Sequence, residues 1–217
     1  MITRIEQAIT DRLKRGLGQM VRTVKSYNGE ADDLAGQIHT LPAVWVTFGG
    51  CKVEKADSGN FRYRNSGEFV VMCATRSLRN EQALRQGGID IREVGSNDLI
   101  TAVRRLLDGQ RVAGDDSRGL IPNAIRPIAN HVLVTNAAVS IYAVEYTLHW
   151  NSMALENGRF PEEARDPADP DYLFTKYKGE LSAPYPPFEI MDGLIIDPKR
   201  GAKLPHHFDL RKSDGQD

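Results

Sequence analysis

The chain has 217 residues, of which 41% are apolar and 26% are charged, and its formal net charge is −1. This composition is that of a globular protein with one large or two small domains, and the near-zero charge argues against a general binder of duplex DNA or of anionic membranes. No apolar run approaches the roughly 18 residues that cross a bilayer, and the N-terminus lacks the apolar core of a signal peptide. Cys51 and Cys73 form no CxxC pair, so we expect a reducing, cytosolic compartment and no structural zinc.

The first expected element is an amphipathic helix, because apolar residues recur at spacings of three and four over residues 2–13. Thr3 and Glu6 have the spacing of a capping box, and the glycines at positions 16 and 18 are expected to end the helix. A weak strand over 21–27 and a helical turn over 34–38 are expected next. They are followed by a strand over 44–48, which a turn at Gly49–Gly50 closes. Hairpin arms over 52–56 and 61–64 and an inner strand over 68–75 complete this half.

The second half of the body is predicted to hold two helices and two long strands. The helices cover about 80–86 and the segment after Ser96, whose apolar face lies within 99–107. The strands cover 126–135 and 138–150, and strict alternation in the latter indicates a half-buried antiparallel strand. This order predicts an α+β fold: a single antiparallel or mixed sheet with helices packed on one face, plus a long extended C-terminal arm.

Composition changes near residue 150 and predicts two parts, a body over 1–150 and an arm over 151–217. The arm holds eight of the 11 prolines and seven of the 16 aromatic residues, with 13 acids against 9 bases. Spaced aromatic residues on a proline-stiffened segment are buried only against its own body or a neighbouring subunit. The residues chosen as partner-binding anchors are Tyr172, Phe174, Tyr177, Tyr185 and Phe188. Asp192–Gly193 predicts a tight hairpin turn, and residues 211–217 are expected to be a frayed end.

Candidates for chemistry are weak, and we expect no catalytic, cofactor-binding or metal-binding residues. His206, His207 and Asp209 form the densest cluster of possible metal ligands, but adjacent histidines in an extended segment point to opposite sides, so an exposed arm segment is favoured. Cys51 is the better candidate nucleophile, whereas Cys73 lies in an apolar run typical of a buried strand. Neither a phosphate-binding loop nor a dinucleotide fingerprint is present.

The order of segments resembles the tail terminator proteins of Mu-like phages and prophages. The segments are MITRIEQAITDRLKRGLG, LPAVWVTFGG, EFVVMCATRSLRNEQALRQGG, LITAVRRLLDGQRV and a strand pair ending in YAVEYTLHW. The resemblance covers about residues 1–150 and implies a structural protein without enzymatic activity. It further implies a ring, typically six-fold, on the head-proximal end of the tail. Such a ring stops polymerisation of the tube protein and joins the tail to the neck.

The partners implied by this resemblance are other copies of the chain, the tail tube, possibly the sheath, and a neck or head-completion protein. Genomic DNA passes through the centre of such a ring without specific binding, and the protein resides in the virion after assembly in the host cytoplasm. Two alternatives stay open from the sequence. One is another neck, connector or baseplate protein of the virion, and the other is a small hydrolase that uses Cys51 or the His206/His207 cluster.

Overall fold

The computed structural model describes residues 1–56, 61–77, 81–88, 93–112, 114, 118–134, 137–185, 190–196 and 203–209. The contacts between residues in space divide the chain into two compact units, Met1–Glu156 and Asn157–Asp217.

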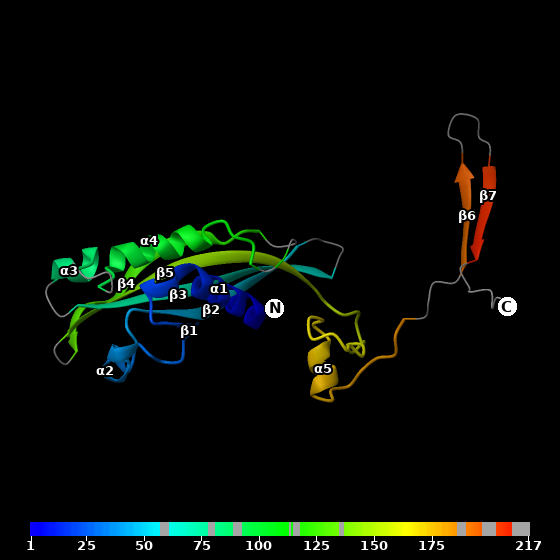
Figure 1. The fold of residues 1–217 in the computed structure, drawn as a ribbon. Helices are drawn as coiled ribbons and strands as arrows, with labels where there is room; N and C mark the ends of the chain where they lie inside the picture. Colours follow the sequence, from blue (N-terminus) through cyan, green and yellow to red (C-terminus); the bar gives the residue numbers. More distant parts are fainter. Residues whose placement is uncertain are drawn as a thin grey trace, which may run out of the picture. The chain divides into compact units, whose positions relative to one another are not determined.

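The first unit is built on a five-stranded sheet with the order β1-β2-β3-β5-β4 (Figure 1). Its strands are β1 (Thr23–Ser26), β2 (Ala43–Lys55), β3 (Arg62–Ser77), β4 (Ile121–Val134) and β5 (Ala137–Met153). β1 pairs parallel with β2, and all other neighbours pair antiparallel, so the sheet is mixed. With its helices, this sheet confirms the predicted α+β class.

The two long helices, α1 (Ile2–Leu17) and α4 (Ser96–Leu107), pack on one face of the sheet (Figure 1). Their apolar stripes meet one face of the central strands in a core that includes Ile9, Val103 and Val144, all fully buried. The predicted periodicity of both helices is therefore confirmed. The predicted capping box is wrong, because α1 begins one residue before Thr3, with Met1 as N-cap and no side-chain cap hydrogen bond. A short helix, α3 (Glu81–Gln86), precedes α4.

The opposite face of the sheet is covered at one end by the connection between β1 and β2. This connection contains α2 (Leu34–Gln37) and the 3-10 turn η2 (Ile38–Thr40), and a second 3-10 turn, η1 (Gly18–Met20), follows α1. A second cluster of buried apolar residues forms on this face, and it includes the fully buried side chains of Leu41, Trp45 and Ile141. The predicted alternation of β5 is observed over residues 144–150, whereas residues 137–141 are buried on both faces.

Gly49–Gly50 does not end a strand, which corrects the expectation of a turn there. β2 continues through both glycines to Lys55, and the register with β3 shifts between Phe48 and Gly50, the signature of a β-bulge. Gly50 has a φ of 125°, a conformation that only glycine adopts without strain. The predicted strand over 44–48 and the predicted hairpin arm over 52–56 are therefore one strand.

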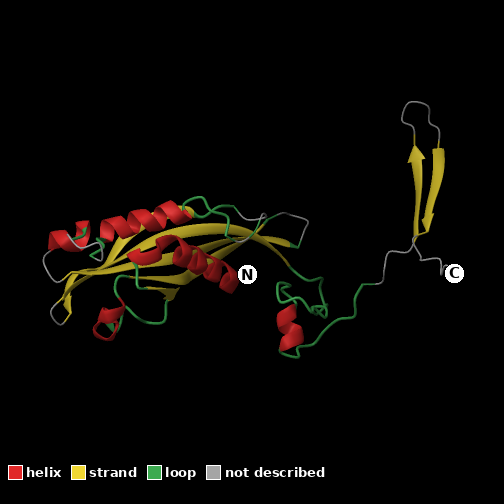
Figure 2. Ribbon diagram, in the orientation of Figure 1, coloured by secondary structure: helices red, strands yellow, loops and turns green. Residues whose placement is uncertain are grey.

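Beyond the bulge, the ends of β2, β3 and β5 run past the ends of α1 and α4 (Figure 2). The Trp150 side chain of β5 lies over Gly67 of β3, where a Cβ would be only 2.5 Å from the indole ring. The Asn65 amide donates a hydrogen bond of 2.8 Å to the Ser152 hydroxyl in the neighbouring strand. These contacts join β3 to β5 near the projecting ends of the strands.

The second unit contains α5 (Tyr172–Lys176) and a two-stranded antiparallel sheet of β6 (Ile190–Ile196) and β7 (Lys203–Asp209). A hairpin is therefore present, but the predicted turn at Asp192–Gly193 is wrong. Both residues lie inside β6, where Asp192 pairs with His207 and Gly193 with His206. Residues 211–217, predicted to be frayed, lie outside the described residues.

Candidate assembly surfaces

One edge of the main sheet carries a row of exposed apolar side chains, which we call the β4 rim. Its members are each between 42% and 72% exposed: Ile121, Ile125, Ile128, Val132 and Leu133. Arg126 is the only Asp, Glu, Lys or Arg residue in the sequence of β4. Edge strands of soluble proteins ordinarily carry charges, so exposed apolar side chains on both faces of this edge strand make it a candidate surface for contact with another chain.

The β4 rim offers side chains for packing rather than a backbone for strand pairing. Pro122 and Pro127 lack a backbone N–H, and the register with β5 shifts at three places along the strand. Prolines and bulges prevent the edge-to-edge addition of another strand. The one charged residue, Arg126, forms an ion pair with Glu145 of β5. A partner of this edge would therefore bind through apolar contacts.

The opposite edge of the sheet has different chemistry, because β1 is much shorter than β2. β1 pairs only with residues 43–46 of β2, and the Tyr27 N–H then donates to the Val46 carbonyl at 2.8 Å. In the described part of the chain, no strand pairs with this edge of β2 over residues 51–55. We call this segment the β2 edge. It carries Lys52, Glu54 and Lys55, with Lys52 and Glu54 in an ion pair of 2.7 Å.

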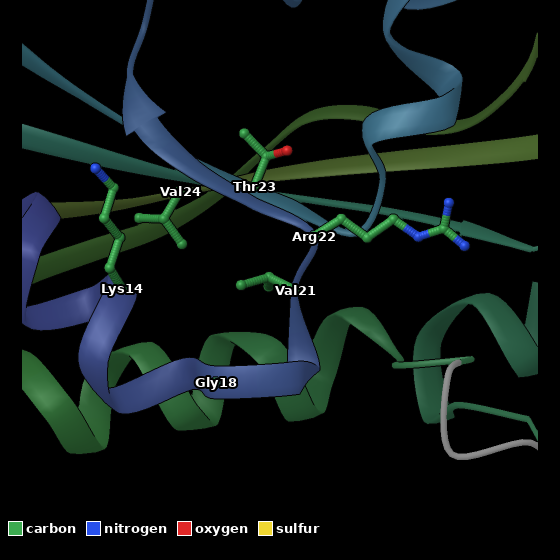
Figure 3. Close-up of a pocket in the computed structure, with 6 residues that line it drawn as sticks. All are labelled: Lys14, Gly18, Val21, Arg22, Thr23 and Val24. Carbon is green, nitrogen blue, oxygen red and sulfur yellow. The ribbon is translucent and has the colours of Figure 1, made fainter.

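Two hollows lie along this side of the sheet. The first, of about 310 Å³, lies between the end of α1 and β1 and is lined by Lys14 and Arg22 (Figure 3). The two cationic groups point away from each other, and Arg22 donates to the His39 carbonyl at 3.1 Å, so they do not converge on one anion. The second, of about 510 Å³, lies at the bulge beside Gly50 and Lys52. It is a shallow depression on the face of the sheet, because Ser66 and Glu68 of β3 and Thr147 of β5 also line it.

Residues 157–185 of the second unit fold on themselves around Arg159. The Arg159 guanidinium lies 3.7 Å from the centre of the Tyr185 ring and donates to the Glu162 carboxylate and to the Ala183 carbonyl. The Thr175 hydroxyl of α5 accepts a hydrogen bond of 3.0 Å from the Ala164 backbone N–H. This part of the predicted extended arm is thus locally folded.

The predicted anchors are placed in different ways by this unit. Phe174 and Tyr177 are exposed, Tyr177 at 72%, and Tyr172 is half-buried in α5. Tyr185 is exposed but lies against Arg159. Phe188 lies outside the described residues. The structure thus presents aromatic surface on the second unit, and the assignment of these five residues as anchors stays a prediction.

The candidate nucleophile Cys51 is not activated by its surroundings. Desolvation raises the pKa of its exposed thiol, and the backbone N–H of Ser66 offsets only part of that rise. Burial raises the pKa of Cys73 to about 12. A nucleophilic thiol needs a lowered pKa. The nearby histidine, His149, instead has its Nδ1 2.9 Å from the Ser66 hydroxyl.

The histidine cluster also has a local partner. His207 Nδ1 lies 2.5 Å from the Asp192 carboxylate across the β6–β7 pair, and the side chain of His206 lies outside the described residues. Among the described residues, no group of three His, Cys, Asp or Glu side chains is placed to hold a metal ion. Over the same residues, none of the helices has the length and apolar character to span a bilayer.

Comparison with known proteins places the first unit in a phage protein family. Residues 1–151 match the family model described as "Bacteriophage Mu, Gp37". One solved structure, titled "Virion of native gene transfer agent (GTA) particle", contains a similar chain with 13% identity and a TM-score of 0.39, covering 68% of this chain and 96% of that chain. No curated protein matches the sequence.

The fold is a small α+β sheet with exposed edges, and the sequence matches a phage protein family. The chain therefore belongs to the class of structural proteins of the phage tail and neck. The chain is a member of the Bacteriophage Mu Gp37 family, because the match covers residues 1–151 of 217. This membership confirms the resemblance to tail proteins of Mu-like phages.

The two sheet edges were not among the predicted site residues. The β4 rim has a signal in the sequence, since residues 121–134 hold six Ile, Val or Leu residues beside one charged residue and two prolines. The β2 edge has none, because its exposure depends on where the neighbouring strand β1 ends.

Proposed function

We propose that this protein is a tail terminator: a six-fold ring on the head-proximal end of the tail tube that stops polymerisation and joins the tail to the neck. In this proposal, the ring contacts the tube, a neck or head-completion protein and, where the tail has one, the sheath, and genomic DNA passes through its centre. Assembly takes place in the host cytoplasm. Membership of the Gp37 family supports the placement in the phage tail or neck.

The observation that carries the ring is the difference between the two edges of the main sheet. A ring is built from heterologous contacts, so each subunit needs two different complementary surfaces rather than one self-complementary patch. The β4 rim is apolar and blocked for strand pairing, whereas the β2 edge is polar and open. The sheet order places them on opposite sides of the same unit. The two edges therefore differ too much for one self-complementary patch, and each needs a different partner surface, as in a head-to-tail ring.

The C-terminal part adds a third surface to the proposal. We assign residues 1–150 as the body of the subunit and residues 151–217 as an arm that contacts a neighbouring subunit. Its proposed contact residues are Tyr172, Phe174, Tyr177, Tyr185 and Phe188. Aromatic side chains that are exposed in one chain are the common anchors of protein interfaces.

The role is tested in two steps. Light scattering over a concentration series is expected to give a mass of six chains for the full-length protein, and a strictly monomeric protein argues against a ring that closes in isolation. Electron microscopy of particles produced without the gene is expected to show tails of irregular length, restored by complementation. Tails of normal length, or a location of the labelled protein at the baseplate, refute the terminator assignment.

A further inference from the structure

The C-terminal hairpin is a two-stranded sheet that lacks a third partner within the described residues. β6 and β7 pair from Ile190 opposite Asp209 to Ile196 opposite Lys203. Met191 and Leu194 of β6 are 42% and 49% exposed. A two-stranded hairpin is marginally stable at best in water, and a third strand or an apolar surface is needed to stabilise it. The hairpin is therefore suited to completion by another sheet.

β6 is the strand of this hairpin that is suited to pair with a partner. Pro205 lies inside β7 and removes a backbone donor from that strand, whereas every residue of β6 keeps its N–H. Asp192 is the only charged residue in the β6 sequence IMDGLII. An apolar strand with a full set of backbone donors and acceptors favours addition to the edge of a sheet.

The β2 edge, residues 51–55 of the first unit, offers the backbone groups that such an addition needs. The Ala56 N–H donates to the Arg62 carbonyl of β3 at 3.0 Å. In an antiparallel pair, successive residues alternate between facing the partner strand and facing away from it, so the backbone groups of residues 51, 53 and 55 point away from β3. The β2 edge has five residues and β6 has seven, so β6 is long enough to pair along the whole edge.

The charges of the two surfaces are complementary. Besides Glu54, the β2 edge carries Lys52 and Lys55, and the adjoining end of β3 carries Arg62 and Arg64. The two strands of the hairpin carry Asp192, which lies 2.5 Å from His207, and Asp209, against the single Lys or Arg residue Lys203. An excess of positive charge on one surface and of negative charge on the other steers the two together and disfavours pairing of like surfaces.

From these features we propose that β6 of one copy adds as an extra strand to the β2 edge of a neighbouring copy. The occupant is a second copy because hairpin and edge are different surfaces, and their pairing between chains gives the head-to-tail contact that a ring requires. The inference thus rests on the proposed homo-oligomeric ring and names one of its contacts. Main-chain hydrogen bonds supply this contact.

Disulfide crosslinking of the full-length chain tests the contact, because Cys51 already lies exposed on the β2 edge and Cys73 is buried. Met191→Cys and Leu194→Cys place a second thiol on opposite faces of β6, so one of them shares a face with Cys51 in either strand direction. Mild oxidation and a non-reducing gel are expected to show dimers and higher species from one of the two variants. The matched control is Ile2→Cys, at an exposed site at the start of α1 outside both surfaces, which is expected to give no crosslink to Cys51.

The crosslinked species are expected to disappear when Cys51→Ser is added to the same variant. Dimers that persist with Cys51→Ser show that two hairpins pair with each other and overturn the proposal, and so does an intrachain disulfide, which gives a compact monomer. Light scattering separates the two levels of inference. An oligomer without crosslinks from either variant refutes this contact and leaves the ring intact, whereas a monomer without crosslinks refutes both.

Discussion

Leu133→Asp on the β4 rim is expected to weaken association of the subunits while leaving the single chain folded. Leu133 is 72% exposed, so its removal takes little from the core of its own unit, and exposed substitutions ordinarily change the free energy of unfolding by about 0.5 kcal/mol or less. Full burial of a leucine contributes about 1.5–3 kcal/mol. Covering the exposed part in an interface therefore contributes about 1–2 kcal/mol, which corresponds to about a 5–30-fold change in Kd. A carboxylate in the same place adds its own desolvation cost.

The assay is sedimentation or light scattering over a dilution series, with urea denaturation of the same samples. Ile2→Asp is the matched control, because Ile2 is exposed at the start of α1, where a negative charge is compatible with the helix N-terminus. If the Leu133→Asp oligomer persists to the same dilution as the wild-type oligomer, the β4 rim is not an interface between subunits. A loss of several kcal/mol in the unfolding free energy shows instead that the residue belongs to the core of its own chain.

Three further predictions concern the fold that supports these surfaces. Leu107→Ala, which truncates a fully buried side chain of α4, is expected to lower the free energy of unfolding in urea by about 2–5 kcal/mol, and a neutral effect contradicts the described core. Gly67→Val is expected to lower it by about 1–3 kcal/mol, because the new side chain meets the Trp150 ring; Trp150→Leu in the same chain recovers part of the loss, and strictly additive effects argue against that contact. Burial raises the pKa of the Glu30 carboxyl, but the hydrogen bonds from Lys25 and a backbone N–H together outweigh it, so the pKa lies below its ordinary value of 4.5. A group with a lowered pKa in the folded state stabilises the protein above its unfolded pKa, and this contribution is lost as the pH falls through the folded pKa. Glu30→Gln is therefore expected to show a smaller loss of unfolding free energy between pH 7 and pH 3 than the wild type does, and an unchanged pH dependence counts against the ion pair.

The helices could be predicted from the sequence because their signal is local. Ile5, Ile9 and Leu13 repeat with the period of the helix that they form, and all three are fully buried on the sheet. The exact start of the helix was missed, because the spacing of Thr3 and Glu6 allows a capping box without requiring one.

Glycine-containing pairs were the main source of error. Gly49–Gly50 and Asp192–Gly193 have the local chemistry of turns, yet both lie inside strands. Whether such a pair turns or continues depends on the strand that faces it, which in these cases is β3 or β7. That partner lies many residues away, and local composition does not identify it.

The assembly surfaces were predicted only in kind. The sequence predicts partner-binding aromatic residues in the C-terminal part, and the second unit does expose Phe174 and Tyr177. The sequence does not identify β4 as the apolar edge strand. Whether a strand lies at the edge of a sheet depends on the order of the strands and not on its own residues.

The two tryptophans of the chain lie on opposite faces of one sheet, Trp45 in the cluster covered by the β1–β2 connection and Trp150 over Gly67 near the projecting strand ends. The protein therefore carries two intrinsic fluorophores in separate environments. Replacing one of them at a time by phenylalanine gives emission spectra that report on each layer separately. A spectral change confined to Trp150 on mixing with tube protein would locate the response near the projecting strand ends.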